Sequence, residues 1–246
     1  MTQFTIVLAG KRIQISTLYE STKAFCRDYI CDGDGDFTVT VSPADIAFER
    51  EKSAREDGLE GIPKRHFSDE YLETLAVYRK IAEKMPEYNI FLFHGSVIAV
   101  DGEGYLFTAK SGTGKSTHTR FWRQAFGSRA IMVNDDKPLL QIKDDGVWAH
   151  GTPWDGKHHL SANTSVRLKG ICILERGSEN HIEPIAAKQA LPMLLQQSYR
   201  PKHATGVDAL LRLLDAVCAK MRFYRLHCNL DPDAAYVAYD GMQQAK

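Results

Sequence analysis

The chain has 246 residues, 43% of them hydrophobic and 25% charged, a balance typical of a globular protein with a sizeable core. Lys and Arg together number 31, as do Asp and Glu, so no net charge would attract nucleic acid or an anionic membrane. No apolar run is long enough for a membrane span, and the first residues lack the pattern of a signal peptide, so we expect a cytoplasmic protein.

The five cysteines are odd in number and never spaced as CxxC, which favours reduced thiols over a disulfide framework or a zinc site. Neither this feature nor any other decides the oligomeric state, and a homo-oligomer is left open.

The N-terminal third predicts a small α+β portion. Residues 4–8 and 12–15 are β-rich around a glycine turn and predict a hairpin, and 37–41 alternate as in a strand. Ser68 is a suitable N-cap for a helix that reaches about Met85. The polar stretch 49–65 is the expected flexible connection. We therefore expect residues 1–87 to form an N-terminal α+β portion with a role related to substrate, and residues 88–246 to form the core that carries the chemistry.

The core alternates short strands, turns and helices. Strands are predicted at 90–93, 96–100, 105–108, 130–133, 138–142, 147–150, 166–174 and 223–228, and helices at 115–125, 187–197 and 204–220. Asp231-Pro232 is a suitable start for a last helix. Because hairpins precede and follow the central elements, we expect an α/β (α+β) fold with a mixed, largely antiparallel sheet and flanking helices.

A glycine-rich segment lies between the strand 105–108 and the helix that begins at 115. Its sequence, AKSGTGKS over residues 109–116, matches GxxxxGK[ST] except that Ala109 replaces the first glycine. Such a loop presents backbone N–H groups and a helix N-terminus to phosphates. Lys115 would reach the β- and γ-phosphates, and the Ser116 hydroxyl would bind Mg²⁺. The expected ATP-binding residues are Ser111, Gly112, Thr113, Gly114, Lys115, Ser116 and Thr117.

Two adjacent carboxylates, Asp135 and Asp136, follow the buried strand 130–133 and Asn134. Phosphoryl transfer to a hydroxyl needs a carboxylate that holds the metal and a base that accepts the proton. The pair could divide these roles, and the sequence does not decide which aspartate is the base. We assign the metal to Ser116 and Asp136.

At these residues the chain resembles the catalytic domain of HPr kinase/phosphorylase, in the superfamily of phosphoenolpyruvate carboxykinase. The likeness covers about 88–175 and depends on His94-Gly95, the phosphate loop and Asn134-Asp135-Asp136. It implies an ATP-binding mixed-sheet core and Mg²⁺-dependent phosphorylation of a hydroxyl. His94, Lys115, Asp135 and Asp136 are then the expected catalytic residues. Thr117 stands where HPr kinases commonly carry glutamate, and no Glu-Val-Arg-Gly stretch is present, so HPr is not the expected acceptor.

The substrate residues are expected in a loop at 151–159 and at the end of the strand 166–174. An exposed Trp154 beside Lys157 and His158 would suit an acceptor site, although a Trp packed inward fits the sequence equally well. Arg176 could stabilise charge on the transferred phosphoryl group.

The sequence thus predicts a kinase that uses Mg²⁺ and ATP to phosphorylate a peptide or protein serine or a small alcohol. The alternatives are an ATP-binding sensor or scaffold without catalysis and a carboxykinase-like enzyme acting on a keto acid.

Overall fold

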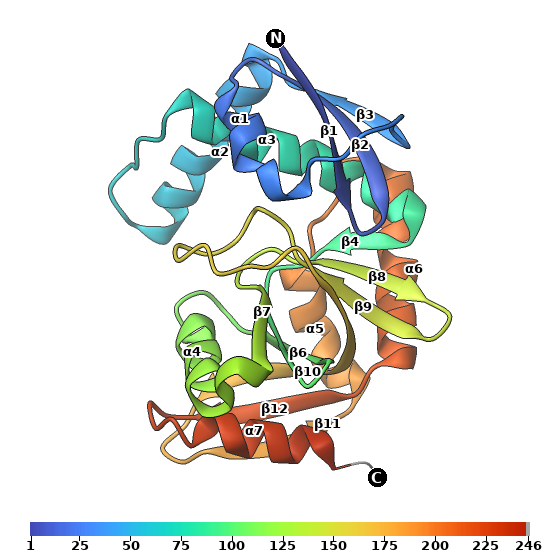
Figure 1. The fold of residues 1–246 in the computed structure, drawn as a ribbon. Helices are drawn as coiled ribbons and strands as arrows, with labels where there is room; N and C mark the ends of the chain where they lie inside the picture. Colours follow the sequence, from blue (N-terminus) through green and yellow to red (C-terminus); the bar gives the residue numbers. More distant parts are fainter. Residues whose placement is uncertain (245–246) are drawn as a thin grey trace. The chain divides into compact units, whose positions relative to one another are not determined.

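The computed structural model describes residues 1–244 of the chain. These residues belong to two compact units, Met1–Lys84 and Met85–Lys246 (Figure 1). The division falls three residues before the boundary expected from the sequence.

The first unit is built on a three-stranded sheet in the order β1-β2-β3. Strands β1 (Thr2–Leu8) and β2 (Lys11–Thr17) form the predicted antiparallel hairpin, and β3 (Phe37–Thr40) lies parallel to β2. The turn between β1 and β2 is tight because Ala9 and Gly10 both have positive φ. The short helices α1 (Ser21–Phe25) and η1 (Arg27–Tyr29), which the sequence analysis missed, connect β2 to β3.

The expectation of a flexible connection at 49–65 is wrong for most of its length. Helix α2 runs from Pro43 to Glu60. Its start is specified locally: Ser42 and Asp45 form a capping box and Pro43 stands at the first turn, while Gly61, with φ of 67°, ends the helix. The polarity that suggested a linker is that of a helix with few buried residues.

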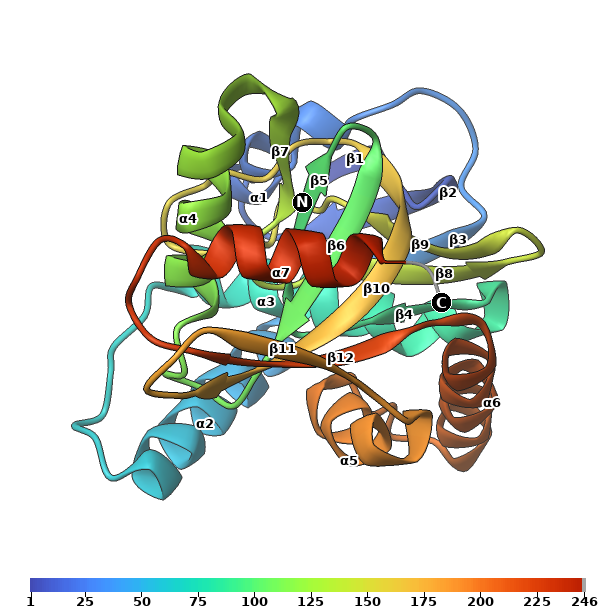
Figure 2. The same ribbon diagram turned by 90° about the horizontal axis from the view of Figure 1, so that it is seen from below.

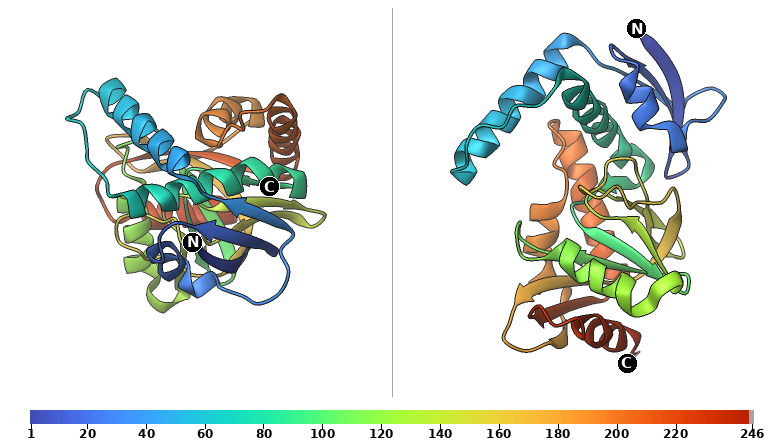
Figure 3. Two further views of the ribbon diagram at one scale, coloured as in Figure 1. Left: turned by 90° about the horizontal axis from the view of Figure 1, so that it is seen from above. Right: turned by 60° about the vertical axis from the view of Figure 1, so that its left-hand side comes forward.

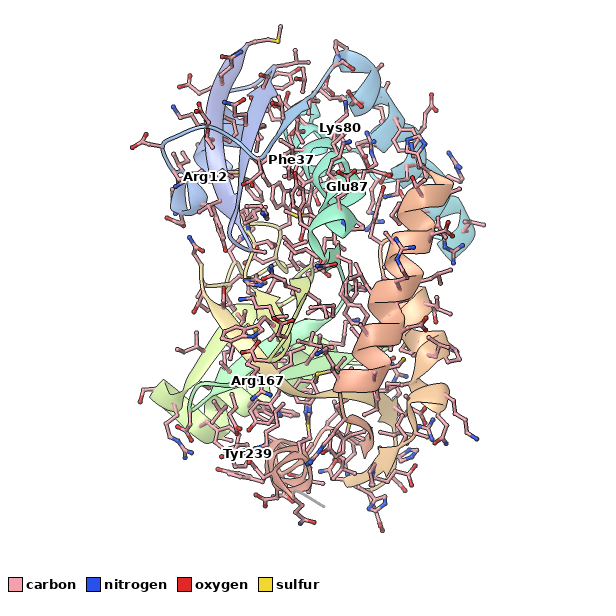
Figure 4. The ribbon with its side chains drawn as sticks, turned by 90° about the vertical axis from the view of Figure 1, so that its right-hand side faces the viewer. Arg12, Phe37, Lys80, Glu87, Arg167 and Tyr239 are labelled. Atoms are coloured by element: carbon pink, nitrogen blue, oxygen red, sulfur yellow. The ribbon has the colours of Figure 1, made fainter. Side chains whose placement is uncertain are left out.

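Helix α3 (Asp69–Lys84) confirms the predicted helix and packs on α2. The Arg79 guanidinium forms ion pairs with Asp45 and Glu49 of α2, at 3.2 Å to the Asp45 carboxylate. Lys80, labelled in Figure 4, donates to the carbonyl of Thr40 at the end of β3. Charged side chains therefore join the two helices to the sheet.

The described residues of the second unit form a nine-stranded sheet with the path β4-β8-β9-β10-β6-β5-β7, to which β12 and β11 are added beside β10. Strand β10 is parallel to β6 and to β12, and every other pair in this part is antiparallel. This confirms the mixed, largely antiparallel sheet. The strands are β4 (Ile90–Leu92), β5 (Ser96–Val100), β6 (Glu103–Thr108), β7 (Ala130–Asn134), β8 (Leu139–Lys143), β9 (Gly146–His150), β10 (Ser165–Arg176), β11 (His181–Ile185) and β12 (Phe223–Cys228).

Alternation along the central strands sends side chains into two cores, one on each face. On β6, Leu106 joins the core covered by α5 (Ala187–Gln197) and α6 (Ala204–Lys220). Its neighbours Tyr105 and Phe107 point to the opposite core, covered by α4 (Lys115–Phe126) and α7 (Ala234–Gln243). Figure 2 shows α7 lying across β6 and β10. Tyr239 of α7, labelled in Figure 4, packs its ring against Trp122 of α4.

Two C-terminal features differ from the sequence analysis. Strand β11 was missed because it is a short edge strand that contains Pro184, and proline within an apolar run argues against a strand. Helix α7 begins at Ala234 rather than at Asp231-Pro232, because Asp231 and Asn229 accept backbone hydrogen bonds in a turn that precedes the helix. Short 3₁₀ turns, η2 (Met85–Tyr88) and η3 (Gly127–Arg129), precede β4 and β7.

None of the helices in residues 1–244 combines the length and the hydropathy of a membrane-spanning segment.

Candidate active site

The glycine-rich loop connects β6 to α4, as the sequence predicts for a phosphate-binding loop. Gly112 and Gly114 take φ of 74° and 115°, values that residues with a Cβ adopt only with strain. Gly114 is the N-cap of α4, and its carbonyl accepts the first helical hydrogen bond, from His118 at 2.9 Å. Helix α4, green in the right-hand view of Figure 3, thus begins directly at the loop.

Ala109, the departure from the usual loop pattern, has a structural explanation. Its side chain is fully buried in the core under α4 and α7, and its φ is not positive. This position therefore needs no glycine, and the loop keeps glycine where the backbone requires it.

Lys115 folds back over the loop, with its ammonium donating to the Ala109 carbonyl at 3.3 Å. Burial lowers its pKa, and the charges of Asp136 and Asp135 offset part of that effect, so the pKa lies below the usual range. The lysine, both aspartates and the loop therefore lie within one electrostatic environment.

Asp135, directly after β7, is buried beside α4. Its Oδ1 accepts from the Thr119 hydroxyl at 3.3 Å, and its backbone carbonyl accepts from Ser96 at 3.1 Å. Burial raises the pKa of Asp135, and hydrogen bonds from Ser116 and Thr119 partly oppose the rise. The structure thus brings the loop serine to Asp135, whereas the sequence predicts Ser116 and Asp136 as the metal ligands.

Asp136 interacts with His94 instead. The Nε2 atom of His94 lies 3.2 Å from Asp136 Oδ1, and Lys137 lies 3.7 Å from Oδ2. Burial raises the pKa of Asp136, but the His94 hydrogen bond and the charge of Lys137 lower it by more, so the pKa lies below its usual range. A backbone hydrogen bond joins the same two segments, because the Gly95 N–H donates to the Asp136 carbonyl at 3.0 Å.

Asn134 fixes the turn that carries both aspartates. Its side-chain oxygen accepts from the backbone N–H groups of Asp136 and Lys137, at 2.9 and 2.6 Å. Its amide donates to the Thr152 and Trp154 carbonyls, at 3.2 and 3.4 Å. A fully buried amide therefore joins the acidic pair to the loop after β9. The register between β5 and β7 also shifts just before Asn134, as is common beside functional sites.

The loop after β9, residues 151–160 and so one residue longer than the predicted 151–159, differs from the expectation at Trp154, which is only 3% exposed and packs inward. An exposed indole as a substrate contact is therefore wrong, because the backbone hydrogen bonds to Asn134 hold this part of the loop against the protein. Lys157 and His158 are exposed. Gly156 lies against Asp135: a Cβ at this glycine would stand 2.9 Å from Asp135 Oδ2.

Arg176, at the end of β10, reaches the phosphate loop. Its Nη2 atom donates to the Gly112 carbonyl at 2.9 Å. The side chain is exposed, so it lies at the rim of the loop, a place from which it could contact a bound phosphate.

A cleft of about 450 Å³ opens beside Ser116 and Asp135. It is lined by Ser116, Thr117, Arg120, Arg123, Asp135, His158 and Leu160. The two arginines were missed by the sequence analysis. They lie four and seven residues after Ser116 on a predicted helix, and this spacing, which places them on the same helix face as Ser116, could have identified them.

The donor set suits Mg²⁺ bound together with a nucleotide. Within residues 1–244, no group of three or more His, Cys, Asp or Glu side chains could hold a metal by itself. Mg²⁺ commonly takes one or two carboxylates, a hydroxyl and substrate phosphates. Ser116 beside the buried carboxylate of Asp135 matches that pattern.

Comparisons with known proteins match one family model and 59 chains of solved structures. The HPr(Ser) kinase/phosphatase from Coxiella burnetii is similar at 12% identity and a TM-score of 0.30, over 50% of this chain and 86% of that chain. No curated protein matches the sequence. The family model described as SynChlorMet cassette protein ScmC matches residues 66–222, well over half of the chain. The chain therefore belongs to the ScmC family.

Proposed function

We propose that the chain is a kinase that uses Mg²⁺ and ATP to phosphorylate a hydroxyl, either of a peptide or protein serine or of a small alcohol. The observation that carries this proposal is the division of the acidic pair at the mouth of the phosphate loop. Asp135 lies beside the Ser116 hydroxyl, and Asp136 pairs with His94. Phosphoryl transfer to an alcohol needs these two kinds of carboxylate.

The proposed roles follow from these contacts. Ser116 and Asp135 would hold Mg²⁺, which supplies charge neutralisation to the phosphates when bound. Asp136 accepts the proton of the attacking hydroxyl, and the contact with His94 positions its carboxylate. Lys115 and the loop backbone bind the phosphates. As the new O–P bond forms, the bond from the γ-phosphorus to ADP breaks, and the proton passes to Asp136.

The test is product formation from γ-labelled ATP, with peptides, amino acids, sugars and polyols as acceptors. Asp136→Asn should lower turnover by about 10²- to 10⁴-fold, the usual cost of removing a general base, while the affinity for Mg–ATP changes little. The matched control is Asp144→Asn, an exposed aspartate in the β8–β9 turn, which should leave turnover unchanged.

Two outcomes would contradict the proposal. Wild-type turnover in Asp136→Asn would remove the base assignment. Binding of Mg–ATP without transfer to any acceptor class would favour the sensor, and nucleotide turnover that depends on oxaloacetate would favour a carboxykinase.

A further inference from the structure

The cleft beside Ser116 contains more positive charge than a phosphate loop requires. Arg120 and Arg123 enter it from α4, and His158 enters it from the loop 151–160. Asp135 is the carboxylate among its lining residues. Ser116, Arg120 and Arg123 are spaced at i, i+4 and i+7, so they lie along one face of α4.

The charge of neither arginine is neutralised by a carboxylate of the described residues. In the described part of the chain, neither forms an ion pair, and the Nε atom of Arg123 is buried without a hydrogen-bond partner. The Arg120 guanidinium lies over the Phe121 ring at 5.5 Å, which orients it while leaving the side chain exposed. Arg123 therefore lines the cleft with a guanidinium that no described carboxylate pairs with, which favours an anionic ligand that accepts hydrogen bonds.

The nucleotide does not account for both arginines. Phosphates bound at a helix N-terminus contact the loop and the first helical turn. The Cα atom of Arg123 lies about 10 Å farther along the helix axis than that of Ser116, at about 1.5 Å per residue. We therefore assign the anion at Arg123 to a second molecule, beyond the phosphates that the loop and the first helical turn would hold.

We propose that this cleft binds an anionic group of the phosphate acceptor, a carboxylate or a phosphate, and that the acceptor is therefore an anionic alcohol. Arginine recognises both groups through paired, charge-assisted hydrogen bonds. The inference rests on the proposed function, because the molecule placed in this cleft is the acceptor of that phosphoryl transfer.

The experiment is calorimetric titration of the full chain saturated with Mg–ADP. The probes are glycerate, glycerol 3-phosphate and uncharged glycerol, which share a three-carbon alcohol and differ in charge. At least one anionic probe should bind more tightly than glycerol, and the two anionic arms separate carboxylate from phosphate. Arg123→Gln should weaken that probe by about tenfold or more, the usual effect of losing a charge-assisted hydrogen bond, and Arg123→Lys by less.

The controls separate this cleft from the nucleotide site. Arg120→Gln, at an exposed position where folding is not at risk, should also weaken the probe, and Arg212→Gln, at an exposed arginine of α6, should not. Mg–ADP affinity should stay unchanged in the cleft variants. An equal loss of Mg–ADP and probe affinity, or no preference for either anionic probe over glycerol, overturns the proposal.

The proposed function fails separately, if the wild-type protein does not bind Mg–ADP. Titration of the anionic probes without nucleotide then still reports on the arginines alone.

Discussion

The phosphate loop and the loop 151–160 face the same aspartates but are specified in different ways. The first depends on its own backbone: Gly112 and Gly114 supply the positive φ values, and α4 begins at once. The second is held from outside, by the buried amide of Asn134 and by contact of Gly156 with Asp135. A segment specified locally can be identified from a short motif, whereas one specified by distant partners cannot.

Among the substitutions that test this difference between the two loops, Asn134→Ala is expected to have the largest effect. The variant leaves buried backbone groups of both the acidic turn and the loop 151–160 without partners, at about 1–3 kcal/mol for each group. We expect a loss of about 3–5 kcal/mol in the free energy of unfolding, measured by chemical denaturation. Gln124→Ala, at an exposed amide of α4, is the control and should be nearly neutral. A loss of 1 kcal/mol or less (about the value of one ordinary hydrogen bond) would show that the amide does not hold the loop.

The second-largest effect is expected from protonation of His150, the last residue of β9, which leads into the loop 151–160. The ring is buried between Ser165, at 2.6 Å from Nδ1, and Gln141, at 3.1 Å from Nε2. Burial lowers its pKa to about 4. Between pH 6.5, the approximate pKa of histidine in the unfolded chain, and about pH 4, His150 is protonated in the unfolded chain but neutral in the folded protein. The free energy of unfolding therefore falls as the pH decreases through this range, by up to about 3 kcal/mol near pH 4.

Replacing this histidine measures that contribution. In His150→Gln, the loss of stability between about pH 6.5 and pH 4 should be smaller than in the wild type. The measurement is chemical denaturation at a series of pH values in this range. His181→Gln, at an exposed histidine of β11, should keep the wild-type profile. The same slope in all three proteins would mean that His150 is not held neutral in the fold.

The smallest effects should come from the phosphate loop itself. Gly114→Ala places a Cβ at φ of 115° and should weaken Mg–ADP binding by about tenfold, because strained backbone of this kind costs about 1–3 kcal/mol. Ala109→Gly restores the usual motif but removes a buried methyl group, so it should lower stability by about 1 kcal/mol and leave Mg–ADP affinity unchanged. Tighter binding in Ala109→Gly would contradict the view that the loop needs no glycine there.

Much of the fold could be predicted because its signals are local. The helices 187–197 and 204–220 and the strand 223–228 match the structure at both ends. The polarity of residues 49–65 predicts a connection where helix α2 lies, although its capping box is a local signal. Strand β11 is not evident from the sequence because of Pro184 and its edge position. How the N-terminal unit contributes to substrate binding stays a prediction.

The sequence by itself determined the glycine-rich loop between strand and helix, the position of the acidic pair after a strand and the mixed sheet, since each depends on residues adjacent in the chain or on a regular period. Only the tertiary structure decided that Ser116 lies beside Asp135 and that His94 pairs with Asp136. It also decided that Trp154 is buried and that Arg120 and Arg123 share a cleft with His158. These relations join strands, helix and loop across long sequence separations, and they are settled by packing and buried hydrogen bonds, which no local pattern records.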